Sequence, residues 1–145
     1  MTTKELFDPK HIDIFIPDNI EFISFILTSL GYGNTNESSE EAREHGLDTI
    51  EKLLELELIE VFSWGHYEDK LKGKEIPLIK KMRYMAELWP KGAKRGDFYE
   101  MPMFKYKDWY LEALERDAKD FDTYEDFFKK IGNLEQWIEQ NRPKE

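Results

Sequence analysis

The chain has 145 residues, enough for a single domain, residues 1–145, with a buried core. With 40% hydrophobic and 14% aromatic residues, it is too apolar for a disordered chain. Its 31 acidic and 21 basic side chains give a formal charge of −10, which argues against general affinity for nucleic acid or anionic membranes and leaves a basic partner open.

The sequence predicts neither cysteine chemistry nor a membrane segment. The absence of cysteine excludes disulfides, thiolate metal sites and cysteine nucleophiles. Residues 1–19 contain no uninterrupted apolar stretch of the kind found in a signal peptide. No apolar run approaches the ~20 residues of a membrane-spanning helix, so we expect a cytoplasmic protein.

The N-terminal part of the chain predicts a short extended segment followed by a helix. Residues 12–16, "IDIFI", favour a strand or an extended arm. Asp18 is a plausible N-cap, since apolar residues recur at helical spacing between residues 20 and 30. Gly31 and Gly33 then end this helix, because glycine accepts the left-handed conformation of a C-terminal cap. The polar residues 34–39 follow as a loop.

A second helix and a strand come next. Ser38 and Glu41 match a capping box, and Leu47, Ile50, Leu53 and Leu54 mark one apolar face. Gly46 costs such a helix ~1 kcal/mol relative to alanine, so its presence indicates close packing. Residues 58–64, "LIEVFSW", alternate in part and predict a strand.

The middle of the chain predicts a turn or wing, a third helix and an extended segment. Residues 66–76 are polar, and Pro77 suits the first turn of a helix. Residues 90–97 break that helix, and residues 98–106 are expected to be extended, with Pro102 indicating an edge strand. The apolar stripe of the third helix consists of Leu78, Met82, Met85 and Trp89.

The last third of the chain is helical by pattern and rich in aromatic residues. Thr123 with Asp126 is expected to cap one helix that runs to Ile131, and residues 133–141 form another; whether the two are continuous through Gly132 is left open. The aromatic residues are expected to lie in the core. One helix face is expected to hold Tyr110, Leu111, Leu114, Ala118 and Phe121. The predicted class is therefore α+β and predominantly helical: an N-terminal helix–helix–strand unit followed by aromatic-rich C-terminal helices.

No motif predicts a reaction, a metal or a cofactor. Glu41 and His45 share a helix face, but two ligands do not complete a metal site. A Ser, His and Asp set lies close together in sequence without the G-x-S-x-G elbow of a serine hydrolase. We therefore expect a protein that is not an enzyme; carboxylate acid–base chemistry is the enzymatic alternative. The members of that set are Ser63, His66 and Asp69.

Charge is segregated along the sequence. Residues 37–60 hold nine acidic and two basic side chains, a net charge of −7, whereas residues 70–95 hold nine basic and two acidic ones, a net charge of +7. Arg43 and Lys52 lie off the acidic face of the second helix. The basic segment has two alternative roles: folding back onto the acidic helix, or binding a phosphate or RNA backbone. The acidic face, called the acidic stripe below, consists of Glu40, Glu44, Asp48, Glu51 and Glu55.

Two resemblances bear on function. Within residues 18–75, "GLDTIEKLLELELIEV" followed by "SWGHYEDKLKGKE" resembles the closing part of a winged-helix unit, but with Glu and Asp where a DNA reader carries basic side chains. The chain as a whole is similar to small acidic immunity proteins of bacterial toxin–immunity systems, such as contact-dependent growth inhibition. This likeness rests on size, the lack of cysteine, the aromatic content, the acidic helix before "LIEVFSWG" and the later "IKKMRYMAELWPKG".

The sequence thus predicts a binding protein whose acidic stripe docks onto a basic partner. The resemblance implies that this partner is a nuclease-type toxin, which the protein neutralises. Trp64 and Tyr67 are the expected exposed aromatic anchors, because charge alone rarely supplies residence time. The alternative is a nucleic-acid-binding or regulatory winged-helix-like protein that uses residues 70–95. The sequence does not indicate an oligomeric state.

Overall fold

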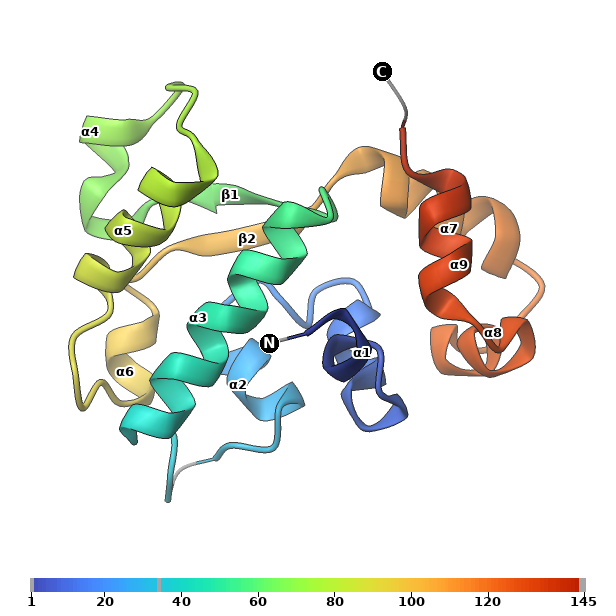
Figure 1. The fold of residues 1–145 in the computed structure, drawn as a ribbon, viewed down its shortest axis with the longest axis horizontal. Helices are drawn as coiled ribbons and strands as arrows, with labels where there is room; N and C mark the ends of the chain where they lie inside the picture. Colours follow the sequence, from blue (N-terminus) through green and yellow to red (C-terminus); the bar gives the residue numbers. More distant parts are fainter. Residues whose placement is uncertain (1, 34, 144–145) are drawn as a thin grey trace.

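The computed structural model describes residues 2–33 and 35–143, and all side chains in these ranges except that of Arg95. Asn34, in the predicted loop 34–39, and the side chain of Arg95, in the basic segment, lie outside the described residues. The described chain is α+β and predominantly helical, with one two-stranded sheet (Figure 1).

The helices and strands follow one another in this order: α1 (Thr3–Leu6), η1 (Pro9–Phe15), α2 (Ile23–Ser29), α3 (Glu40–Glu55), β1 (Ile59–Ser63), η2 (Gly65–Tyr67), α4 (Glu68–Leu71), α5 (Leu78–Leu88), α6 (Arg95–Phe98), β2 (Met103–Tyr106), α7 (Asp108–Ala118), α8 (Tyr124–Ile131) and α9 (Leu134–Asn141). Two of these elements, η1 and η2, are 3₁₀ helices.

The sheet joins two segments that are far apart in sequence. β1 and β2 pair in antiparallel fashion with Ile59 opposite Tyr106, and the register shifts between Val61 and Ser63. The second edge of β2 is partly covered, because the Phe104 N–H donates to the Glu21 carbonyl (3.0 Å). The strand predicted over residues 58–64 is confirmed. Of residues 98–106, which were expected to be extended, only Met103–Tyr106 form an edge strand, because the short helix α6 (Arg95–Phe98) and a turn precede it.

Helix α3 occupies the centre of the molecule (Figure 1), where it packs against α5, α2, α1 and β1. Its glycine allows the closest approach: a Cβ at Gly46 would lie 2.5 Å from Trp89 Cη2 and 3.1 Å from Leu27 Cδ2. The close packing that the sequence indicated at Gly46 is confirmed. Trp89 itself is fully buried, as are Ile50 and Leu53 on the same side of α3.

The N-terminal predictions are partly wrong. Residues 12–16 are neither a strand nor an arm, because most of them belong to η1, which begins where the Asp8 carboxylate accepts a hydrogen bond from the Lys10 N–H (3.0 Å). Asp18 is not an N-cap; it adopts a φ of 77°, and α2 begins only at Ile23. The reason is tertiary, since Phe22, the residue before α2, is extended and bridges to Met103 in β2, and the Glu21 carbonyl accepts from the Phe104 N–H.

Two buried tyrosines hold η1 in place. The hydroxyl of Tyr106, from β2, donates to the Ile14 carbonyl, and that of Tyr110, from α7, donates to the Phe15 carbonyl (2.5 Å). Burial raises the pKa of both phenols well above the ordinary value. They therefore act as neutral donors that satisfy carbonyl groups at the end of a 3₁₀ helix.

Several local boundaries differ from the sequence-based expectation. The N-cap of α3 is Ser39 instead of Ser38, since Ser39 Oγ accepts from the Ala42 N–H (3.1 Å). Gly31 has the predicted positive φ, but Gly33 does not. The segment predicted as a turn or wing starts with η2 and α4 instead. The chain turns there at Gly65, which adopts a φ of 60° against the backbone of residues 100–101.

The C-terminal helices α7, α8 and α9 gather at one end of the molecule (Figure 1). Thr123 caps α8 as predicted, and Gly132, with a φ of 74°, separates α8 from α9. Aromatic packing is confirmed here, since the Trp137 ring meets that of Phe127 edge-on at 5.4 Å. Leu111 departs from the expected buried face and is 37% exposed.

Candidate docking surface on helix α3

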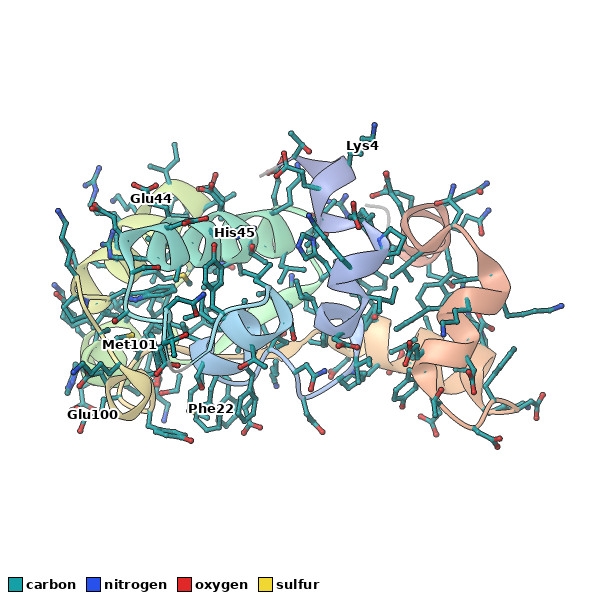
Figure 2. All side chains as sticks on the ribbon, turned by 90° about the horizontal axis from the view of Figure 1, so that it is seen from below. Lys4, Phe22, Glu44, His45, Glu100 and Met101 are labelled. Carbon is teal, nitrogen blue, oxygen red and sulfur yellow. The ribbon has the colours of Figure 1, made fainter. Side chains whose placement is uncertain are left out.

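The acidic stripe lies on the outer side of α3. All five of its carboxylate side chains are exposed, whereas Ala42, Gly46, Thr49, Ile50 and Leu53 on the other side of the helix are buried. Helical periodicity alone explains this division, because residues three or four positions apart share a face. Figure 2 shows Glu44 on the side of the molecule opposite to Phe22.

Two carboxylates of the stripe, Glu40 and Glu55, form ion pairs with described lysines. Lys91 Nζ lies 3.6 Å from Glu40 Oε1, and Lys52 Nζ lies 3.7 Å from Glu55 Oε2. Exposed pairs of this kind contribute only ~0–1 kcal/mol, so they are easily exchanged for contacts with a partner. Among the described residues, neither Glu44 nor Glu51 has an ion pair. All five carboxylates of the stripe nevertheless remain exposed to solvent.

The basic segment packs beside the acidic helix through a different kind of contact. Arg43, from α3, donates through Nε to the Trp89 carbonyl (2.7 Å) and through Nη2 to the Ala86 carbonyl (2.8 Å). These carbonyls lie at the C-terminal end of α5, where helical carbonyls lack intrahelical partners. Arg43 of α3 therefore caps the C-terminal end of α5. Within the described chain, the ion pair between residues 37–60 and residues 70–95 is the one between Glu40 and Lys91.

The two predicted aromatic anchors have different environments. Trp64 is only 6% exposed, because its ring packs edge-on against Tyr84 at a centroid distance of 6.2 Å. The expectation that Trp64 is an exposed anchor is wrong. Tyr67 is half-buried, its hydroxyl donates to Glu87 Oε2 (3.3 Å), and Lys70 Nζ lies 5.1 Å from its ring centroid. Of the pair, Tyr67 alone keeps a surface that a partner can reach.

A histidine pair lies on the flank of α3. Tyr32 Oη is 3.1 Å from His45 Nδ1, and the ring of His11 meets that of His45 edge-on at 6.0 Å. His11 donates from Nδ1 to the Glu5 carbonyl (2.7 Å), because a carbonyl can only accept. Burial lowers the pKa of His45, and the neighbouring His11 lowers it further by a smaller amount. Burial raises the pKa of Tyr32, and the negative charge of Glu41 raises it further by a smaller amount.

This arrangement bears on the metal and catalytic motifs. His45 uses Nδ1 toward Tyr32, and the described residues contain no group of three His, Asp or Glu side chains placed to hold a metal ion. Ser63 Oγ accepts from the Gly65 N–H (3.2 Å), while His66 Nε2 lies 3.4 Å from a carboxylate of Glu100. Ser63 and His66 therefore each contact a group outside the Ser, His and Asp set.

Sequence reasoning missed the exposed aromatic and apolar side chains on other surfaces. Phe62 is 61% exposed, and Tyr99 is 54% exposed and meets Phe22 edge-on at 5.0 Å. Aromatic residues within predicted strands and helices resemble core residues, so no local signal distinguishes them. Only the tertiary arrangement shows which of them the core leaves outside.

The comparisons with known proteins give no relative. No protein-family model matches the chain, and neither a curated protein nor a solved structure matches it. Among the described residues, no helix combines the length and the apolar character needed to cross a membrane.

Proposed function

We propose that this protein is a non-catalytic cytoplasmic binding protein that captures a basic protein through the acidic stripe of α3. The observation that supports this function is the exposure of all five carboxylates of the stripe along one face of a single helix. Like charges three or four residues apart repel one another by a few tenths of a kcal/mol per pair. A basic partner would relieve this repulsion and gain attraction at the same time.

The kind of partner follows from the linear arrangement of the charges. A nuclease-type toxin carries Lys and Arg in a cleft that attracts phosphates, and a row of carboxylates on a rigid helix imitates the charge of a nucleic-acid backbone. The resemblance to small acidic immunity proteins supports neutralisation of such a toxin. The winged-helix-like layout proposed for residues 18–75 would then present carboxylates where a DNA-binding relative presents cations.

Electrostatic complementarity would mainly accelerate the encounter, raising the association rate toward ~10⁸ M⁻¹s⁻¹ at low salt. An apolar contact is needed to slow dissociation. Since Trp64 is buried, Tyr67 is the aromatic anchor that remains for this role.

The test compares two triple variants with the same change in net charge. Glu44→Lys, Asp48→Lys and Glu51→Lys reverse the centre of the stripe, while Glu112→Lys, Glu115→Lys and Asp120→Lys reverse exposed carboxylates elsewhere. A toxin encoded beside the gene, or recovered by pull-down from the native cell, would be purified for stopped-flow kinetics. We expect the stripe variant to associate at least ~10-fold more slowly at low salt, and the control variant far less so.

Two further readouts make the proposal falsifiable. Raising the ionic strength should bring the association rates of the wild type and the stripe variant together, because salt screens exposed charges. The stripe variant should also fail to protect cells that express the toxin. Equal rates at low salt and full protection by the stripe variant would show that the stripe is not the docking face.

A further inference from the structure

The outer edge of β1 is unpaired. In the described part of the chain the sheet has two strands, so β1 has a neighbour on one side only. The Lys107 N–H donates to the Leu58 carbonyl (2.8 Å), so the C=O group of Leu58 points toward β2. The N–H and C=O groups of Glu60, two residues further along the strand and opposite Lys105, point the same way. Because these directions alternate along an antiparallel strand, the N–H and C=O groups of Ile59 and Val61 point away from β2.

A cleft with a volume of about 570 Å³ runs along this edge. It is lined by all the residues from Glu60 to Trp64 and by no residue of β2. Side chains of a strand alternate between the two faces of a sheet, so a cleft that touches five successive residues adjoins the strand edge and not one face. Its other wall comes from Glu68, residues 71–74, Ile76 and Lys81. Figure 1 shows α4 and the connection to α5 on the side of β1 away from β2.

The cleft combines free cations with an apolar lining. Lys72 and Lys74 are exposed and Lys81 is half-buried, and none of the three forms an ion pair within the described part of the chain. Both carboxylates of the lining already have partners: Glu60 pairs with Lys105 (3.5 Å), and Glu68 Oε2 accepts from the Trp64 N–H (3.5 Å). The apolar part of the lining consists of Val61, Phe62, Trp64, Leu71 and Ile76.

We propose that this cleft binds an extended segment of a partner polypeptide in which acidic and apolar side chains alternate, and that the segment joins β1 as a third strand. The outward peptide groups of Ile59 and Val61 would supply main-chain hydrogen bonds, which give affinity in strand addition, while side-chain contacts give specificity. The three lysines would face the carboxylates of the segment. A volume of 570 Å³ is within the ~300–1,000 Å³ typical of ligand sites.

A segment of a different polypeptide fits this edge better than a second copy of the chain. Two copies, each with a net charge of −10, repel one another. This site is independent of the acidic stripe, which fits a basic surface, and it stands whether or not the proposed function is correct.

The test uses the whole protein and two pools of blocked eight-residue peptides. In one pool Glu alternates with Val, Ile, Leu or Phe, and in the other Lys replaces Glu. Amide shifts and hydrogen exchange would be followed by NMR at low salt. We expect the Glu pool alone to shift residues 59–64 and 71–76 and to slow exchange at the Val61 amide at least ~10-fold. A Glu pool with fully N-methylated backbones should not bind, because it lacks the donors for strand addition.

Variants and competing ligands complete the test. Reversing Lys72, Lys74 and Lys81 to Glu should weaken binding of the Glu pool at least ~10-fold, whereas reversing the exposed Lys10, Lys119 and Lys130 should not. The variant with Glu44, Asp48 and Glu51 reversed should bind the pool as the wild type does, which separates this site from the proposed function. No shift at 1 mM peptide, equal binding of the N-methylated pool, stronger binding of a uridine decamer, or a dimer joined through β1 would each overturn the proposal.

Discussion

The two faces of α3 obey different constraints. On the inner face, Gly46 leaves no room for a methyl group beside Trp89, and Ile50 and Leu53 are fully buried. On the outer face, the five carboxylates are exposed, and the pairs that Glu40 and Glu55 form with described lysines are weak. Packing therefore fixes the position of the helix while the outer face remains free to serve a partner. Substitutions on the two faces should accordingly affect different measurements.

The largest expected effect is on the inner face, with Gly46→Ala. Alanine favours a helix by ~1 kcal/mol over glycine, but overpacking a core costs ~1–3 kcal/mol, and here the new Cβ would meet the buried indole of Trp89 at 2.5 Å. We expect a net loss of about 2 kcal/mol in the free energy of unfolding, measured by urea denaturation. Gly96→Ala is the matched control, because a Cβ there meets nothing within 4 Å. A stable Gly46→Ala variant would contradict the packing.

A slightly smaller effect is expected at Arg43, which joins the acidic helix to the end of α5. Its two hydrogen bonds reach the carbonyls of Ala86 and Trp89, and a hydrogen bond from a charged donor contributes ~1.5–3 kcal/mol. Arg43→Ala should lower the free energy of unfolding by about 1.5 kcal/mol. Arg43→Lys should recover less than half of that, since an ammonium group lacks the planar fork. Lys52→Ala, on the same helix, should change stability by less than ~0.5 kcal/mol.

An intermediate effect, dependent on pH, is expected on the flank at His45. Its pKa is lowered in the folded protein, mainly by desolvation and by His11 from η1, against the opposing charges of Asp48 and Glu5. The unfolded chain therefore takes up this proton first on acidification, so stability that is present above pH ~6.5 is lost as the pH falls through the folded pKa. Urea unfolding at pH 7.5 and 5.5 should show this loss, and His45→Gln should reduce it. An unchanged pH dependence in His45→Gln would contradict the assignment.

The smallest effect on stability is expected on the outer face. Reversing Glu44, Asp48 and Glu51 to Lys makes the 40/44 and 51/55 pairs attractive, while the 44/48 and 48/51 pairs remain repulsive between like charges. Each such pair is worth a few tenths of a kcal/mol. The free energy of unfolding should change by less than ~1 kcal/mol, and circular dichroism should be unaltered. A loss comparable to that of Gly46→Ala would show that the stripe contributes to the fold, and the contrast between the two faces would then be incorrect.

Features governed by neighbours in sequence were predictable, and those governed by distant residues were not. The position of α3, the exposure of its stripe and the Thr123 cap follow from helical spacing and local hydrogen bonds. The Ser39 cap was missed by one position because two adjacent serines satisfy nearly the same pattern. The conformation of residues 12–22 depends on β2 and α7, and the burial of Trp64 depends on Tyr84. No local pattern contains these partners.

The free edge of β1 could not be predicted from the sequence for a related reason. A strand of alternating residues does not indicate where its partner lies, and here the partner is β2, beyond α4, α5 and α6. The lysines of residues 70–81 were recognised as a basic segment, but their position beside the strand edge depends on the turn at Gly65. Composition indicated that this region is basic, but only the fold shows that its lysines line a cleft beside β1.

The tyrosine hydrogen bonds to η1 have a consequence for the order of folding during synthesis. Their donors and acceptors are separated by 92 and 95 residues, so Ile14 and Phe15 emerge from the ribosome long before Tyr106 and Tyr110 are made. Closing such long loops is entropically costly and slow compared with forming a helix. The α3 helix can therefore form while the chain is still growing, whereas the hydrogen bonds that hold the end of η1 cannot form until about three quarters of the protein has been translated.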